Sequence, residues 1–508
     1  MRLAAIRVPG LPSLGWVATI QRGEPDVTVL HGDMVETGDD AFVAGVWDGP
    51  FADFAVTEAT TLMGSGGRVT DNAVTFCNAT HPFDQIYSVR ADDAVHVSNS
   101  LPLLLARTDD GPDLRYRRYR ADRAKQLWRG SVAPPASLPT HNGREVLAHL
   151  ATDLVVGDEL SITVIQKPAP RAPQDFAHYR AMLAETLHRL VSNGTDPLRF
   201  QPLRTLTTIS NGYDSAMASV LAAEAGIRDA LTLASQGSQA DSGQGIGEQL
   251  GLGVKALAGD AWKQQAGEFE IEFAASSSGP VQFPLVALDE QWRDSMVLVG
   301  SLGDDLWDRE HGELEEHLSQ PGSLMFTPSC VHEFGLRAGI VFVHVPLIGA
   351  VHCVDIWRIT KSAEMAPWTT GSDYDRPIPR RIIEEAGIPR GSFATHKYAS
   401  AATSMDESFG LDTRADFQHF WKSAIRAQPA MRGIWYRLEG SVITPFVWRT
   451  TSLLRKLHAP RRIRLRMRWW SYHQSLPSAY QFHWSVLRLI DRYRPEIERT
   501  LARNIAPH

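Results

Sequence analysis

The sequence predicts two regions of different architecture: an α+β region over residues 1–165, and an α/β region with a parallel sheet over residues 174–508. Three observations lead to this prediction. Short apolar segments separated by turns fill the first region, a proline-rich joint occupies residues 166–173, and strand–turn–helix patterns recur beyond it. A joint of this composition between two differently patterned regions is typical of a domain boundary.

Composition and charge narrow the class of protein. With 43% hydrophobic and 21% charged residues, the 508-residue chain has the composition of a folded globular protein. The net charge of −7 makes nucleic acid a less favoured partner. Three widely spaced cysteines, without a Cys-x-x-Cys pair, are typical of a reducing cytoplasm and speak against a structural zinc site.

No segment has the pattern of a signal peptide or a membrane span. The N-terminus lacks a long apolar core behind basic residues. The most apolar later stretch, residues 338–356, is interrupted by His344, Pro346 and Asp355. We therefore expect a cytoplasmic protein that binds no membrane, in which residues 338–356 form a buried strand pair or core segment.

The regular elements can be placed in chain order. Residues 41–47, 74–76 and 95–97 are apolar runs rich in β-branched and aromatic residues, and each predicts a short strand. A helix is predicted over residues 176–192, directly after the joint. The first region is therefore expected to consist mainly of strands, and the second to open with a helix.

The most informative stretch follows that helix. Residues 205–209 are apolar and β-branched and predict a buried strand, residues 210–215 form a polar turn, and an alanine-rich helix then ends at Gly226. A strand, a turn and a helix N-terminus together make an anion site, because backbone N–H groups and the helix dipole point over the turn.

The residue types in this turn indicate which anion it binds. Ser210, Gly212 and Ser215 are small, so a phosphate can approach the backbone. Asp214 would repel a phosphate unless a Mg²⁺ ion lies between them. We therefore expect the three small residues to hold phosphate and Asp214 to bind the metal. The alternative is an ordinary strand–turn–helix with polar turn residues.

A second parallel strand is predicted over residues 230–235, and a polar, glycine-rich connection over residues 237–253 passes into a helix. The pattern Gly245-x-Gly-x-x-x-Gly251 is also close to a nicotinamide dinucleotide fingerprint. It does not follow the first strand of a βαβ unit directly, which makes this alternative the weaker one.

A third strand is predicted over residues 296–299, and the turn after it carries two adjacent carboxylates, Asp304 and Asp305. Ligands of open α/β sheets bind at the carboxyl ends of strands, where this turn would lie. Asp304 is therefore a second candidate metal ligand. The alternative is a solvated turn residue.

Four segments resemble one family. Residues 210–215 (Ser-Asn-Gly-Tyr-Asp-Ser) resemble the pyrophosphate loop Ser-Gly-Gly-x-Asp-Ser of ATP pyrophosphatases, of which the asparagine synthetase and β-lactam synthetase branch fits best. Residues 295–307 resemble that branch's Ser-Gly-(Glu/Tyr)-Gly-(Ala/Ser)-Asp motif, and residues 388–398 follow its Leu-Pro…Arg-x-Lys segment in spacing. Residues 82–101 resemble the late part of its glutamine-hydrolysing domain.

The resemblance implies a fold and a set of site residues. The fold would be a degenerate glutaminase-like (Ntn-hydrolase-like) domain over residues 1–165, followed by an ATP-pyrophosphatase synthetase domain with a helical C-terminal part. ATP and Mg²⁺ would be the cofactors, with Asp214 and Asp304 sharing the metal and Lys397 stabilising the acyl-adenylate and the oxyanion. The residues that the resemblance assigns to the adenine side of the nucleotide are Leu233, Ala234 and Asp241.

The sequence departs from the family pattern at Asn211, Ser301, Leu302 and Thr395. The family's glutaminase nucleophile is a cysteine directly after the initiator Met. Arg2 stands there and supplies no thiol, so glutamine hydrolysis is expected to be absent. The implied function is ATP-dependent amide formation: a small-molecule or peptide carboxylate is adenylated and joined to an amine other than glutamine-derived ammonia, for example as a lactam or macrolactam.

Two alternatives belong to other classes. The eroded motifs favour a non-catalytic relative that serves as a binding or scaffold subunit, although such a protein has little reason to keep Asp214, Asp304 and Lys397 together. Sulfur insertion into a nucleoside uses a similar loop but would want a reactive cysteine pair, which is not evident.

The C-terminal part is strongly basic. Residues 449–468 hold eight Lys or Arg and no acid, and residues 462–469 alternate with period two. One interpretation is an edge strand or solvated face blunted by charge. The other is a basic surface for an acidic substrate, a carrier or a partner protein, with Trp469, Trp470 and Tyr472 suited to burial in an interface.

Overall fold

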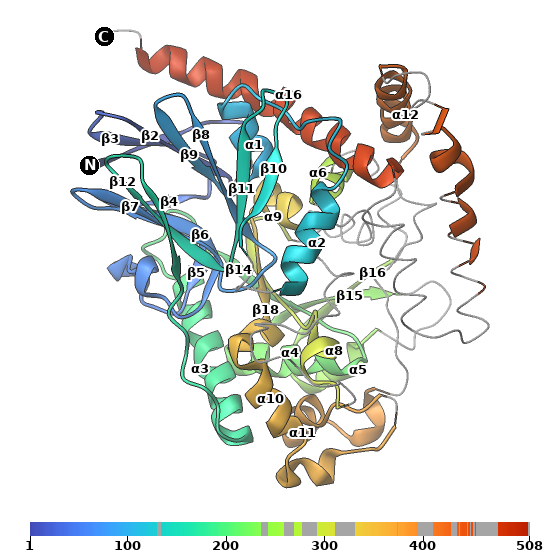
Figure 1. Cartoon of the computed structure of the whole chain (residues 1–508). Coiled ribbons are helices and arrows are strands. Elements are labelled where there is room, and N and C mark those ends of the chain that lie inside the picture. Colours follow the sequence, from blue (N-terminus) through green and yellow to red (C-terminus); the bar gives the residue numbers. More distant parts are fainter. Residues whose placement is uncertain are drawn as a thin grey trace.

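The structure is a computed structural model of the chain. It describes residues 1–129, 134–234, 242–258, 269–276, 292–309, 331–372, 374–394, 410–427, 434–435, 437–443, 445–447, 449–450, 453 and 476–505. Within this part of the chain the strands form three sheets, of seven, six and five strands. The predicted mixture of strand-rich and α/β architecture is confirmed at this level (Figure 1).

Two sheets are built from residues 2–166. The seven-stranded sheet has the order β1 (Arg2–Arg7), β3 (Asp26–His31), β2 (Trp16–Gln21), β9 (Ala94–Ser98), β8 (Gln85–Ala91), β11 (Glu145–Leu150) and β10 (Ala136–Pro139). The six-stranded sheet has the order β13 (Ile162–Gln166), β12 (Thr152–Gly157), β7 (Ala73–Cys77), β6 (Leu62–Val69), β5 (Ala41–Trp47) and β4 (Glu36–Thr37). All their pairings are antiparallel except that of β1 with β3.

These two sheets pack face to face through large aromatic side chains. The ring of Trp16 on β2 lies 5.0 Å from that of Phe42 on β5 and 5.8 Å from that of Phe76 on β7. The Trp16 indole N–H also donates to Ser65 on β6 at 2.9 Å, so its one polar atom is satisfied inside the core. The three strands predicted in this region are confirmed as β5, β7 and β9.

The third sheet is entirely parallel. Its order is β16 (Gly253–Ala258), β15 (Asp229–Ala234), β14 (Arg204–Thr208), β17 (Ser295–Val299) and β18 (Ile340–His344). The chain proceeds outward from β14 through β15 to β16, then returns to the other side of β14 with β17. The strand order therefore reverses between β14 and β17, which makes these two strand ends the topological switch point of the sheet.

The helices connect and cover the sheets. They are α1 (Leu101–Arg107), α2 (Tyr119–Arg129), α3 (Phe176–Gly194), α4 (Tyr213–Glu224), α5 (Gln244–Gln249), α6 (Glu270–Ala275), α8 (Gly303–Leu306), α9 (His332–Ala338), α10 (Cys353–Thr360), α11 (Pro377–Glu385), α12 (Leu411–Arg426) and α16 (Leu476–Ile505). No helix in the described ranges is both long enough and apolar enough to cross a bilayer.

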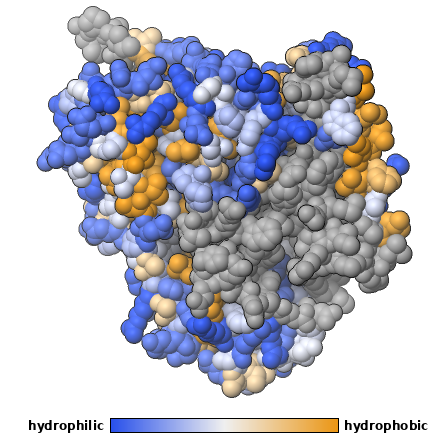
Figure 2. Space-filling view, viewed as in Figure 1, coloured by the Kyte–Doolittle hydropathy of each residue, from blue (hydrophilic) through white to orange (hydrophobic). Residues whose placement is uncertain are grey.

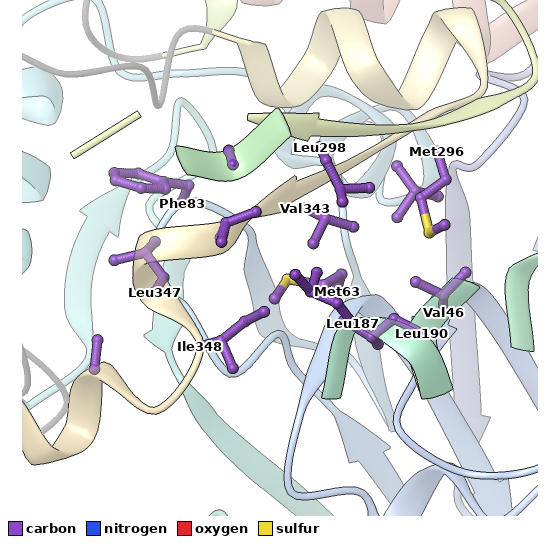
Figure 3. Close-up of a cluster of buried hydrophobic side chains, with 14 of the residues drawn as sticks. Val46, Met63, Phe83, Leu187, Leu190, Met296, Leu298, Val343, Leu347 and Ile348 are labelled. Atoms are coloured by element: carbon purple, nitrogen blue, oxygen red, sulfur yellow. The ribbon is translucent and has the colours of Figure 1, made fainter. Parts of the chain in front are cut away.

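One hydrophobic core joins the parallel sheet to the six-stranded sheet. Figure 3 shows Met296, Leu298 and Val343 of the parallel sheet facing Val46 and Met63, with α3 contributing to the same cluster. All five side chains are buried. The first region is thus attached to the second by apolar contact and not only by the joint.

The C-terminal helix α16 returns to the first region. Val486, Leu489 and Ile490 of α16 are buried in one cluster with Leu101 and Leu104 of α1 (Figure 1). The predicted division at the proline-rich joint stays a prediction, because this contact links the last helix of the chain to its first region.

For the apolar stretch of residues 338–356 the sequence predicted either a buried strand pair or a core segment. It is a buried core segment, as expected, but it contains one strand, β18, instead of a strand pair. Pro346 cannot donate to a strand ladder, and Gly349 adopts a positive φ of 70°. The chain therefore leaves the sheet after His344, passes through 3-10 turns and enters α10.

Candidate functional site

The predicted phosphate loop lies at the carboxyl end of β14. Ser210 and Ser215 close it, with their hydroxyl oxygens 2.6 Å apart and the Ser210 N–H donating to the Ser215 hydroxyl at 3.1 Å. The Gly212 N–H donates to the Ser210 hydroxyl at 3.2 Å, and Gly212 is the N-cap of α4. The three small residues assigned to phosphate are therefore together at the start of a 12-residue helix, and each is only partly buried.

The turn after β17 packs directly on this loop. A Cβ atom on Gly300 would lie 2.3 Å from the carbonyl carbon and oxygen of Asp214, and one on Gly303 would lie 2.4 Å from its carboxyl group. Only glycine permits this approach. Asp304 follows Gly303 at the beginning of α8, so the two predicted metal ligands come from adjacent strand ends and lie close together.

An arginine that the sequence reasoning missed pairs with one of the two carboxylates and is influenced by the charge of the other. The Arg376 guanidinium, 1% exposed, pairs with the carboxylate of Asp214. Burial alone would lower the pKa of Arg376, but the charges of Asp214, Tyr374 and Asp304 together raise it above its ordinary value. Arg376 is thus held as a cation at the switch point, in contact with the carboxylate predicted to bind Mg²⁺.

A second arginine of the same helix anchors the loop. Arg380, one turn after Arg376, donates to the hydroxyl of Tyr213 and lies 5.2 Å over its ring. Tyr213 is fully buried, and burial raises its pKa. Tyr213 stands at the variable position of the loop motif. This variable residue is therefore the one that fixes the loop to α11. A sequence signal existed: Arg376 opens an amphipathic helix with Pro377 next to it and Arg380 four residues later.

The fourth predicted segment also reaches the loop. The Ala394 N–H donates to the carbonyl oxygen of Asn211 at 2.6 Å, so the chain leading toward Lys397 lies against the phosphate loop. Lys397 itself lies outside the described residues, as do Thr395 and Asp241.

The predicted adenine contacts lie at the next strand end. Leu233 and Ala234 are the last residues of β15, where their backbones pair with Leu257 and Ala258 of β16. Ile209 of the loop donates to Leu231 of β15 at 2.9 Å. The carboxyl end of β15 is therefore beside the loop, as the assignment requires.

The departure from the family motif at Leu302 has a physical explanation. Leu302 adopts a left-handed backbone with φ of 79°, at the position where the resembling family has glycine. A leucine in this conformation costs about 1–2 kcal/mol. Its side chain is buried in the core next to Leu306 and Trp307, which offsets the strain by removing apolar surface from water.

The side chains at the switch point can be compared with what Mg²⁺ and ATP require of a binding site. Among the described residues, no group of three His, Cys, Asp or Glu side chains could hold a metal alone. Mg²⁺ bound with nucleotide needs only one or two carboxylates, since phosphates and waters complete its octahedron. Asp214 and Asp304, beside a loop of small residues at a helix N-terminus, fit this requirement.

A further group of titratable side chains, which we call the histidine cluster, lies at the carboxyl end of β18. Its members are His81, Asp84, His332, Glu333 and His344. Asp84 accepts from the ring N–H of His332 at 2.8 Å, and the rings of His81 and His344 are 5.3 Å apart. From the sequence, His344 was identified only as a residue that interrupts an apolar stretch.

Burial sets the protonation of this cluster. It lowers the pKa of His344 to about 3 and raises that of Glu333 to about 7. For His332, burial is the largest single cause and lowers the pKa, but the hydrogen bond and charge of Asp84, the charge of Glu333 and the bond to Asn99 together raise it above its ordinary value. The cluster therefore holds one ion pair, His332 with Asp84, beside His81 and His344, whose pKa values burial lowers.

No family model matches the chain, and no curated protein sequence matches it. The family resemblance therefore rests on the four motifs of the sequence.

Proposed function

We propose that the protein activates a carboxylate with ATP, releasing pyrophosphate, and joins the activated acyl group to an amine, releasing AMP. The observation that carries this proposal is the meeting of two loops at the switch point of the parallel sheet. One is a small-residue loop at the N-terminus of α4, and the other brings Asp304 next to Asp214. Open α/β sheets bind their ligands at this place.

Each group has a defined task in this reaction. The loop residues Ser210, Gly212 and Ser215 and the N-terminus of α4 bind the departing pyrophosphate, on which negative charge develops. Asp214 and Asp304 hold Mg²⁺, which neutralises charge on the phosphates. Lys397, three residues after Ala394 in the sequence, is assigned to the acyl-adenylate and the oxyanion.

Arg376 gives the site a second cation. Its guanidinium pairs with the carboxylate of Asp214 and offsets its charge. With Mg²⁺ on Asp214, the same guanidinium would be able to donate to phosphate oxygens, since it lies at the site where the charges of Asp214 and Asp304 both act on it. Arg376 is thus expected to exchange a carboxylate partner for a phosphate partner.

The ion pair also favours a second candidate function. A buried arginine that neutralises Asp214 makes a metal unnecessary for charge balance, which suits a non-catalytic subunit that binds an anionic ligand or serves as a scaffold. The two candidates differ in one measurable property: only the first consumes ATP.

The deciding experiment is exchange of ³²P-pyrophosphate into ATP with pools of amino acids and other carboxylates, beside Lys397→Ala and Asp214→Ala. Exchange with one pool, lost in both variants, would support adenylation and narrow the acid. Absence of exchange, together with absence of ATP binding in calorimetry, would favour the scaffold. Asp214→Ala with unchanged Mg²⁺-dependent exchange would remove Asp214 from the metal site.

The nitrogen donor is proposed to be an amine other than ammonia from glutamine. Arg2 is the first residue of β1, and its guanidinium donates to Asp26 at 2.8 Å, so this position has a structural partner and no nucleophile. Incubation with glutamine should release glutamate at the background rate. A rate clearly above background would contradict this assignment.

A further inference from the structure

A small cavity lies where the first region, α6 and α9 of the second region, and the C-terminal helix meet. Its wall is formed by β8, β10 and β11, by α1, α2, α6 and α9, and by Phe482 of α16. Its volume is about 20 Å³, which gives room for about one or two particles the size of a water molecule. More of this wall is apolar than polar, whereas hydrophilic side chains cover most of the described surface in Figure 2. A polar occupant must therefore be held by the few polar groups on the wall.

Most of these polar groups already have protein partners. His332 donates to Asp84 at 2.8 Å, and Glu333 accepts from the Ser100 hydroxyl at 2.9 Å. The Ser276 hydroxyl accepts from the N–H of Glu333 at 3.0 Å. An occupant of the cavity is therefore not needed to satisfy these side chains.

Arg123 of α2, which also lines the cavity, differs from them. It is 7% exposed, and its Nη2 donates to the carbonyl oxygen of Phe83 at 2.9 Å. Its Nη1 is buried and has no hydrogen-bond partner among the described residues. A guanidinium stays protonated in proteins, and a buried charged donor without an acceptor costs free energy. The cavity wall thus includes a positively charged group with an unused donor.

The charges around Arg123 do not fully balance it. The groups whose charge raises its pKa are Tyr87, Asp84 and Glu333. Burial raises the pKa of Tyr87 to about 12, so this phenol is neutral at pH 7, and Asp84 is paired with His332. Burial also raises the pKa of Glu333 to about 7, so this carboxyl is only partly ionised at pH 7. On the described part of the wall, the guanidinium therefore has no full counter-charge of its own.

We propose that this cavity binds a small monovalent anion of the size of chloride, held by the Nη1 group of Arg123. The volume admits such an ion, and the positive charge of the guanidinium favours an anion over water. The proposal uses none of the groups assigned to ATP. Because the wall combines β8, α9 and α16, the bound ion would also help to join the first region to the rest of the chain.

Gln85 accounts for the remaining room in the cavity. Its side-chain oxygen is an acceptor that has no partner among the described residues, and Gln85 lines the same cavity. A water molecule between this oxygen and the ion can donate to both. One ion and one water fill a space of about this volume.

Thermal unfolding of the full chain tests the site with two salts, sodium chloride and sodium gluconate, at equal ionic strength. Gluconate is too large for the cavity. The melting temperature is expected to be at least about 2 °C higher in chloride, once chloride exceeds its dissociation constant tenfold. Arg123→Gln should abolish this difference between the salts, because the amide carries no charge. No difference in the wild-type protein, or the same difference in Arg123→Gln, would overturn the proposal.

Arg199→Gln is the matched control. Arg199 is also buried, but its guanidinium donates to the carbonyl oxygens of Asn193 and Gly45 at 2.7 and 2.9 Å and does not line the cavity. This variant should lower the melting temperature in both salts and keep the difference between them. If it loses the difference as Arg123→Gln does, the chloride effect does not belong to the cavity.

A crystallographic measurement on the wild-type protein does not depend on the stability of any variant. Bromide resembles chloride in size and charge and scatters X-rays anomalously. Crystals soaked in sodium bromide should show an anomalous peak next to Nη1 of Arg123. Electron density in the cavity without an anomalous signal would identify water there and would overturn the proposal, as would bromide peaks found only at other places.

Discussion

Two groups of charged side chains lie at neighbouring strand ends of the same sheet, and they are built in opposite ways. The switch-point group has Asp214, Asp304 and Arg376 beside a loop of small residues, and 21% of the Asp214 side chain is exposed. The histidine cluster lies next to it at the end of β18, where His344 pairs with Val299 of β17. Its histidines and Glu333 are 1% to 7% exposed, and the side chain of Asp84 is 27% exposed.

The difference shows that a concentration of titratable groups does not identify a site by itself. In the histidine cluster Asp84 and His332 pair with each other, and a cavity lined by His332 and Glu333 adjoins them. At the switch point, backbone donors and small side chains lie at the N-terminus of α4. Perturbed pKa values occur in both groups, so the helix N-terminus with its small-residue loop, and not the pKa shifts, marks the switch point as the candidate phosphate site.

The largest effect is expected from breaking the ion pair of the histidine cluster. Asp84→Asn should lower the free energy of unfolding at pH 6 by about 3 kcal/mol, because the buried His332 imidazolium would lose its counter-charge. Urea unfolding measures this. Asp26→Asn, which removes an exposed pair with Arg2, should have a much smaller effect. Equal effects would mean that the cluster is not closed to water.

The pH dependence of stability should reveal Glu333. Its pKa is about 7 in the folded protein and 4.5 in the reference state, so the native protein holds this proton more tightly. Its contribution to stability is complete below pH 4.5 and is lost as the pH rises through about 7. Glu333→Gln should therefore gain about 3 kcal/mol over wild type between pH 5 and pH 8. Parallel unfolding curves of the two proteins at both pH values would contradict the burial of this carboxyl.

At the switch point, removing a carboxylate should change the rate of the proposed reaction. Asp304→Asn is expected to reduce Mg²⁺-dependent pyrophosphate exchange about 100-fold, because the metal loses one of two protein carboxylates. Its matched control is Asp305→Asn, which removes the adjacent carboxylate that the motif does not assign to metal. If the two variants lose exchange equally, Asp304 is not the specific ligand.

The smallest expected effect concerns the contact between the two loops. Gly300→Ala would place a methyl group 2.3 Å from the backbone of Asp214 and should lower the free energy of unfolding by about 1–3 kcal/mol. It should also weaken stabilisation by ATP and Mg²⁺ in thermal unfolding. A Cβ on Gly391 meets no atom within 4 Å, so Gly391→Ala should leave both quantities unchanged. A harmless Gly300→Ala would show that the loops can separate.

The sequence by itself determined the local elements. The strand predicted at residues 205–209 is β14 (Arg204–Thr208), that at 230–235 is β15, and the helix predicted at 176–192 is α3 (Phe176–Gly194). These patterns were readable because strand and helix periodicities, and the glycines that end them, act over a few residues. The phosphate loop was visible for the same reason.

Only the tertiary structure decided which groups meet. The pairing of Arg376 with Asp214, the closure of the histidine cluster from two regions of the chain, and the return of α16 to α1 all join residues far apart in sequence. No local periodicity encodes such contacts, because they depend on the order of the strands and on the apolar surfaces that pack together. The loop could therefore be found in the sequence, whereas the cation that faces it could not.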